Sequence, residues 1–188
     1  YGDFSGGIDI ATGAAQVLGI QLERNFERPY LATSIPDFWR RWHISLSTWF
    51  RDYVYIPLGG SRGNKYKQVR NVFIIFLVSG FWHGANWTFI VWGFLNALYF
   101  LPLLLTNRNR KNLSTVTNTL SIRDFFSMLA TFLLTVFAWI FFRSNTITDA
   151  FQYIKRIFDF ESIKLISSLS IERYSLELMV LVIFFIVV

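Results

Sequence analysis

The sequence contains two histidines, and both lie among aromatic residues. His83 stands in "VSGFWHGANW", inside the stretch 71–105, which carries no charged residue. His43 stands in "DFWRRWHISLSTWF", where tryptophans lie on both sides of it. Burial lowers the pKa of an imidazole, and a neutral imidazole can take a proton from a hydroxyl. His83 is therefore a candidate general base.

Three polar groups lie close to His83 in the chain, namely Asn86 and the indole N–H groups of Trp82 and Trp87. They can orient the imidazole or donate hydrogen bonds to a developing oxyanion. The alternative is a structural histidine that is satisfied by a backbone carbonyl. A titratable group at membrane depth is costly, which favours a functional role. For His43 the alternative is packing on an aromatic helix, with its polar edge at the membrane interface.

Composition identifies the class of protein. Of the 188 residues, 53% are hydrophobic and 16% are charged, whereas a soluble domain has about 25% charged residues. Long apolar runs occupy 72–105, with interruptions, and 125–142, and a further run begins at 175 and stops at 188 without a polar flank. Such runs predict membrane-spanning helices. We expect an all-α, multi-pass transmembrane bundle with interfacial helices, whose single catalytic region, 1–188, is a fragment of a larger protein.

Several kinds of chemistry are excluded by residue types. Cysteine is absent, so the chain has no disulfide, thiolate nucleophile or cysteine-ligated zinc. Glycine-rich "LGGSRG" lacks the lysine and hydroxyl pattern of a nucleotide-binding P-loop. The net charge of +6 comes from basic residues in loops between apolar runs, so it indicates membrane topology rather than nucleic-acid binding. We predict no bound metal or cofactor.

An amphipathic helix is predicted over 36–55, with Thr33 or Ser34 as its N-cap and Pro36 in its first turn. On a helical wheel its aromatic residues form one stripe, and His43 lies inside that stripe. Arginines flank it, as expected of a helix at the membrane interface. The arginines can anchor lipid phosphates, or one of them can hold an anionic substrate. The small residues of 1–20 predict a helix that packs inside the bundle or lies at its edge.

The apolar stretch 71–105 has an awkward length. As one helix it would measure about 52 Å, too long for one crossing of a roughly 30 Å hydrocarbon core and short for two. We expect a break at Gly80 and at "HGAN", beside a polar cavity that contains His83. The basic loops 56–71 and 106–124 are both predicted to be cytoplasmic. The run 125–142 predicts a spanning helix, and "DAFQYIKRIFDF" predicts an interfacial one.

Two long motifs, "NFERPYLATSIPDFWRRWHISLSTWFRDYVYIPLGG" and "SGFWHGANWTFIVWG", resemble the membrane-bound O-acyltransferase superfamily. Within it they are most similar to the alginate O-acetyltransferase branch, and "YGDFSGGIDIATGAAQVLG" and "FAWIFFRS" fit the same branch. The resemblance implies a multi-pass enzyme of the bacterial inner membrane. Such an enzyme moves an acyl group, usually acetyl, from a cytoplasmic thioester toward hydroxyls of an exported polysaccharide such as alginate. Acetyl-CoA or an acyl carrier is then the co-substrate, with membrane lipids and periplasmic acetylation proteins as partners.

The resemblance also assigns residues. The histidine of the family's Trp-His-Gly motif falls on His83, and its second motif histidine falls on His43. The aromatic and arginine context of the family places substrate or donor binding at Trp39, Arg40, Trp49, Arg51, Trp82 and Asn86. We expect His83 to deprotonate the acceptor hydroxyl and His43 to orient the donor. A covalent acyl-histidine is the variant mechanism. Two other functions stay open at this stage: a transport segment with proton-relay histidines, and a bis-histidine haem protein.

Overall fold

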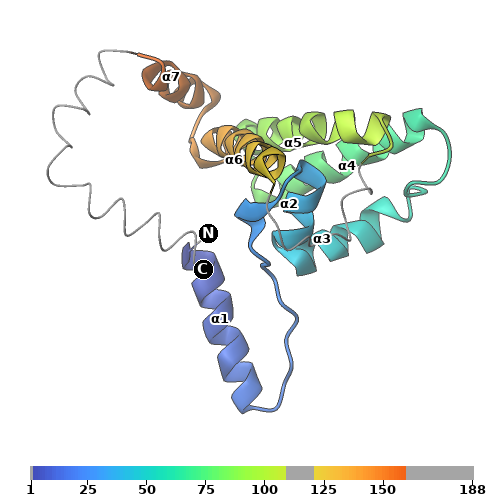
Figure 1. The fold of residues 1–188 in the computed structure, drawn as a ribbon, viewed down its shortest axis with the longest axis vertical. Helices are drawn as coiled ribbons and strands as arrows, with labels where there is room; N and C mark the ends of the chain where they lie inside the picture. The colour runs from blue at the N-terminus through green and yellow to red at the C-terminus, as the bar shows by residue number, and fades with distance from the viewer. Residues whose placement is uncertain (1, 109–120, 160–188) are drawn as a thin grey trace, which may run out of the picture.

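The computed structural model describes residues 2–108 and 121–159, and all of the secondary-structure elements in these ranges are helical (Figure 1). The predicted membrane run 175–188 lies outside the described residues. In chain order the elements are α1 (Gly2–Val17), a 3-10 turn η1 (Pro29–Leu31), α2 (Ile35–Arg41), α3 (Ile44–Phe50), a π-helical turn η2 (Arg51–Tyr55), α4 (Lys65–His83), α5 (Trp87–Leu105), α6 (Ile122–Arg143) and α7 (Ile147–Ile157).

The central part of the fold is a hairpin of α4 and α5, on which α6 packs. Two glycines bring α4 and α5 close together. A Cβ built on Gly80 of α4 would lie 2.4 Å from the carbonyl oxygen of Phe89, and one on Gly93 of α5 would lie 2.4 Å from that of Phe76. The hairpin is thus held at a separation that only glycine allows. Helices α5 and α6 have the length and apolarity to cross a membrane.

The stretch 71–105 is two helices joined by a short turn. The chain leaves the helix at Gly84–Asn86, within the predicted "HGAN" break, and Gly84 has a φ of 153°. The prediction of a break at Gly80 is wrong, because Gly80 lies inside α4, where it serves the contact with α5. Helix α4 also begins earlier than expected, at Lys65, since Asn64 caps it by accepting from the amide of Lys67 at 3.0 Å. Each helix has 19 residues, which makes about 28 Å.

The two predicted basic loops leave the hairpin at the same end. Lys65 Nζ, in the first turn of α4, donates to the carbonyl oxygen of Leu104 at 2.8 Å and also to Asn107 Oδ1. At the opposite end Asn86 Nδ2 donates to the carbonyl oxygen of Asn145 at 2.8 Å, which ties the α4–α5 turn to the end of α6. The turn that carries His83 is therefore remote from the basic loops.

The segment 36–55 is not one helix, which corrects the sequence prediction. Ser34 does cap α2, by accepting from the amide of Asp37 at 3.4 Å, as predicted. The chain then breaks between α2 and α3, where His43 adopts the left-handed conformation (φ 44°, ψ 58°). The carbonyl oxygen of Asn25 accepts from the amide of Ile44 at 2.9 Å, so the extended segment before η1 satisfies a group freed by the break.

Because of this break and the π-helical turn, the predicted aromatic stripe does not stay on one face. The side chain of Trp49 is 49% exposed and that of Tyr53 is 68% exposed, although the wheel places both on the buried face. The predicted spanning segment 125–142 lies within helix α6. Helix α7 packs Ala150 and Ile154 on the core.

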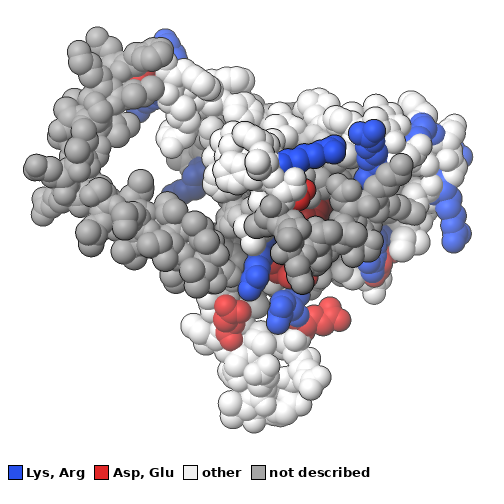
Figure 2. Space-filling model, viewed as in Figure 1, with Lys and Arg blue, Asp and Glu red and all other residues white. Residues whose placement is uncertain are grey.

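Helix α1 projects from the bundle, as Figure 1 shows, and it touches the rest of the protein near its first turns. Its far end carries no charged side chain (Figure 2). Phe4, in the first turn, packs on Phe26 and on the ring of His43, with centroid distances of 5.4 and 5.1 Å. The start of α1 therefore belongs to the wall around His43.

Candidate active site

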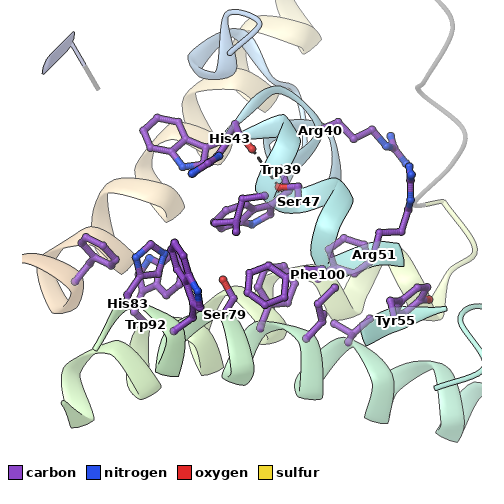
Figure 3. A pocket seen from close by; sticks show the side chains of 18 of the residues that line it. Trp39, Arg40, His43, Ser47, Arg51, Tyr55, Ser79, His83, Trp92 and Phe100 are labelled. Carbon is purple, nitrogen blue, oxygen red and sulfur yellow. Dashed lines mark hydrogen bonds between the residues drawn. The ribbon is translucent and has the colours of Figure 1, made fainter. Parts of the chain in front are cut away.

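A cavity of about 860 Å³ lies between α2, α3 and the hairpin (Figure 3). Its walls come from helices that are far apart in the sequence, since residues of α1, α2, α3, η2, α4, α5 and α6 all contribute. Both histidines line it. No aspartate or glutamate is among the described residues that line it, whereas three arginines are: Arg40, Arg51 and Arg143. The cavity is therefore apolar and aromatic, and the arginines are its charged lining residues among those described.

One face of α4 forms the floor of the cavity. The residues on this face are spaced by one helical turn: Val72, Ile75 and Phe76, Ser79 and His83. His83 is eleven positions after Val72 on the helix, so the floor is about 16 Å long. It runs from the end of the hairpin near the basic loops toward the turn at Gly84.

The imidazole of His83 is enclosed by aromatic rings. The centroid distances are 5.3 Å to Trp82, 5.4 Å to Trp92 and 5.0 Å to Phe142. Neither ring nitrogen makes a hydrogen bond to another described residue. His83 therefore faces the cavity with both nitrogens available to a ligand, and without a carboxylate to stabilise an imidazolium.

His43 lies on the opposite wall, at the junction of α2 and α3 (Figure 3). Its Nδ1 is buried and has no hydrogen-bond partner among the described residues. Burial lowers the pKa of His43 below its ordinary value, and the polar backbone of His43 itself opposes this only in part. The ring is consequently neutral at neutral pH, and Nε2 is the nitrogen left for a ligand.

Two guanidinium groups lie at the other end of the cavity. Figure 3 shows Arg40 and Arg51 together on one side of the site and the two histidines on the other. Arg51 also holds Asp52, through Nε–Oδ1 and Nη2–Oδ2 distances of 2.7 and 3.1 Å. Arg41 is separate, because it pairs with Asp37 at 3.0 Å and does not line the cavity. Arg40 and Arg51 thus lie at one end of the cavity, and the two imidazoles lie at the other.

The profile of the MBOAT, membrane-bound O-acyltransferase family, matches residues 1–144. The chain belongs to the MBOAT family. It is 41% identical over 160 residues to the probable alginate O-acetylase AlgI of Pseudomonas aeruginosa, covering 85% of this chain and 29% of that protein. It is 42% identical over 156 residues to the peptidoglycan O-acetyltransferase of Helicobacter pylori, covering 82% and 28%. The chain therefore spans less than a third of the length of these MBOAT relatives.

A third MBOAT relative is more distant. The teichoic acid D-alanyltransferase of Bacillus subtilis is 36% identical over 104 residues, which is 51% of this chain and 26% of that protein. Members of the family are integral membrane proteins, in agreement with the two apolar helices α5 and α6. The cavity and both histidines lie within the matched residues 1–144.

Most of the residues predicted for the MBOAT site line one cavity. They are Trp39, Arg40, His43, Arg51, Trp82 and His83. Trp49 does not line it, and its ring packs instead on Phe50 and Tyr53, at 5.3 Å in both cases. The predicted helix 36–55 placed Trp49 on the wrong face, because the wheel did not include the break at His43.

Asn86 does not line the cavity either, and its side chain is engaged elsewhere. Its Oδ1 accepts from the amide of Thr88 at 3.2 Å, which caps α5, while its Nδ2 reaches Asn145. Asn86 therefore shapes the turn that follows His83, rather than pointing at a ligand.

The cavity residues that sequence reasoning missed include Ser79, Trp92, Phe142 and Arg143. Ser79 had a usable signal, because a residue four positions before His83 lies on the same face of a helix. The other three come from α5 and α6, and only tertiary packing brings them to the site. Among the described residues no group of three or more His, Cys, Asp or Glu side chains is placed to hold a metal ion.

Proposed function

We propose that this protein is an O-acyltransferase of the bacterial inner membrane, which transfers acetyl from a thioester to hydroxyls of an exported polysaccharide. The observation that carries the proposal is the shared cavity, in which His83 and His43 lie at one end and two arginines lie at the other. A thioester donor on a phosphate-bearing carrier has the same two parts, an anionic group at one end and a reactive carbonyl at the other. Membership of the MBOAT family supports this chemistry.

The donor is proposed to enter from the cytoplasm at the Arg40 and Arg51 end. Guanidinium groups bind phosphate with paired hydrogen bonds, which suits coenzyme A or the phosphopantetheine of a carrier. The floor of the cavity begins there at Val72, in the half of α4 next to the basic loops. Positively charged loops favour the cytoplasmic side. The donor then lies along α4, with its acyl group toward His83.

The acceptor is proposed to approach from the side of the α4–α5 turn. The names of the relatives support a cell-surface polymer as acceptor, since they specify alginate, peptidoglycan and teichoic acid. Two of the three specify O-acetyl transfer, which favours acetyl as the acyl group. An acceptor outside the cytoplasm also requires partner proteins in the periplasm that present or receive the polymer.

The reaction needs one base and no cofactor chemistry. His83 takes the proton of the acceptor hydroxyl while the hydroxyl oxygen attacks the carbonyl carbon of the thioester. The new C–O bond gives a tetrahedral oxyanion. The carbonyl re-forms as the C–S bond breaks, and the thiolate takes the proton from His83. Because no described carboxylate lines the cavity, the imidazolium has no acidic neighbour to stabilise it. The leaving thiolate is then the natural recipient of the proton. His43 positions the donor by hydrogen bonding through Nε2.

The decisive experiment replaces the proposed base. In membranes that contain the protein, His83→Ala should lower acetylation of the polysaccharide by about 10²- to 10⁴-fold, the usual contribution of general base catalysis. Trp87→Phe is the matched control, because Trp87 lies on the same turn, is 74% exposed and does not line the cavity. Immunoblotting verifies equal membrane levels. Retained acetylation by His83→Ala would contradict the proposal, whereas labelled acyl trapped on His83 would favour the acyl-histidine variant.

Donor binding is tested separately. Arg40→Ala and Arg51→Ala should raise the KM for the thioester with a smaller change in kcat, because their contacts are to the carrier rather than to the reacting carbonyl. Arg41→Ala is the control, since Arg41 lies beside Arg40 in the chain but outside the cavity. An equal rise in KM for all three variants would contradict the donor site, because it would show that KM depends on the overall positive charge and not on contacts in the cavity.

A further inference from the structure

Ser79 differs from three hydroxyl residues of α6 and its C-cap. Thr131, Thr135 and Ser144 each donate to the carbonyl oxygen four residues earlier, with Oγ–O distances of 2.8, 2.8 and 2.6 Å. Ser79 is buried, with 9% exposure, yet its hydroxyl makes no hydrogen bond to any described residue. The hydroxyl of Ser79 is thus available to a ligand in the cavity.

The position of Ser79 on α4 defines which part of a ligand it meets. It lies one helical turn before His83 on the same face, where neighbouring Cβ atoms are about 5–6 Å apart. Figure 3 shows Ser79 between His83 and Phe100, on the floor of the cavity. A donor that enters at the arginine end passes Ser79 immediately before it reaches His83. The part of the donor nearest to Ser79 is then the acyl carbonyl.

The other hydroxyl residues of the described lining are not placed for this role. Ser47 Oγ donates to the carbonyl oxygen of Trp42 at 3.2 Å. Tyr55 lies at the arginine end, beside Arg51 (Figure 3). The indole Nε1 of Trp39 is buried within the protein, out of reach of a ligand in the cavity. Ser79 is therefore the hydroxyl donor that lies next to His83 and has no competing acceptor in the described structure.

We propose that Ser79 Oγ donates a hydrogen bond to the carbonyl oxygen of the bound thioester, and that this bond strengthens as the oxygen becomes an oxyanion. This inference rests on the proposed function. Ser79 keeps its proton and forms no covalent bond, while His83 moves the proton of the acceptor. A donor aimed at the developing oxyanion stabilises the transition state more than the bound substrate. Ser79 is on this basis a second catalytic residue, on the donor side of the base.

The test is a steady-state comparison of Ser79→Ala with wild type in membranes, using a labelled acetyl thioester. Loss of one oxyanion donor typically lowers kcat by about 10²- to 10³-fold, so we expect a decrease of that size with little change in the donor KM. Alanine is the best helix former, so α4 should be retained. Thr88→Val is the control, because Thr88 Oγ1 has no partner among the described residues but is buried outside the cavity, and the kcat of this variant should stay unchanged.

The outcomes separate this inference from the function on which it rests. An inactive His83→Ala with a fully active Ser79→Ala would overturn the role of Ser79 and leave the acyltransferase proposal intact. An active His83→Ala would overturn the acyltransferase mechanism itself. A Ser79→Ala defect that appears only in the donor KM, or an equal loss of kcat in Thr88→Val, would also overturn the oxyanion role. Labelled acyl trapped on Ser79 would overturn it as well, because Ser79 would then be the nucleophile.

Discussion

The close contact of α4 with α5 gives a sharp prediction for Gly93→Ala. The added methyl would lie 2.4 Å from the carbonyl oxygen of Phe76 and 3.1 Å from its carbonyl carbon. Both groups belong to helix backbones, so no side chain can move aside. An ordinary contact begins at 3.4 Å, and the two helices must therefore separate by about 1 Å at this point.

This displacement reaches the proposed catalytic groups, because Phe76 lies on the cavity floor one turn before Ser79 and two turns before His83. A misplacement of about 1 Å can cost about 10²-fold in rate. Overpacking destabilises the folded state by about 1–3 kcal/mol. Alanine has a higher helix propensity than glycine, which stabilises the helix by about 1 kcal/mol and partly offsets this cost. We therefore expect Gly93→Ala to lower kcat by about 10²-fold, with only a modest decrease in stability.

The assay pairs acyl transfer in membranes with the apparent melting temperature in detergent. Gly13→Ala in α1 is the matched control, because a Cβ at Gly13 meets nothing within 4 Å and should leave both measurements unchanged. If Gly93→Ala were as active and as stable as wild type, the helices would be free to separate without moving the site. The argument from the glycine contacts would then be refuted.

Three further predictions concern stability and local structure. The pKa of His43 is lowered by burial, so its contribution to stability is present above about pH 6.5 and is lost as the pH falls toward the lowered pKa. The apparent melting temperature should fall over that range, and less so for His43→Gln. Asn86→Ala removes a helix cap worth about 1 kcal/mol and the bond to Asn145, so it should lower both the melting temperature and activity relative to wild type. Lys65→Met removes two hydrogen bonds between the ends of α4 and α5, and amide hydrogen exchange at that end should become faster than in Lys67→Met.

The sequence predicts features that depend on local chemistry. Ser34 is recognisable as a cap because a hydroxyl precedes a proline and an aspartate, and the structure confirms it. The glycine and asparagine that follow His83 mark the turn, since neither favours the middle of a helix. The all-helical architecture follows from the long apolar runs. These features need no knowledge of which helices are neighbours.

Features set by tertiary packing escape the same reasoning. The helical wheel over 36–55 fails because Asn25, from a distant segment, satisfies the backbone of the broken turn at His43. Gly80 reads as a helix breaker in the sequence, yet its role is to let a neighbouring backbone approach. Arg143 gives no signal beyond a helix end, and it becomes a cavity residue only because α6 packs beside the turn that carries His83.

The left-handed backbone at His43 has a consequence for how the site can be studied. The left-handed conformation costs a residue with a Cβ roughly 1–2 kcal/mol in conformational free energy, and it costs glycine far less. His43→Gly should therefore relieve backbone strain while it removes the imidazole. We therefore expect His43→Gly to lower the activity and to raise the stability of the protein. Glycine would suit this backbone better than histidine does. The presence of histidine at a strained turn therefore indicates that the imidazole is needed there.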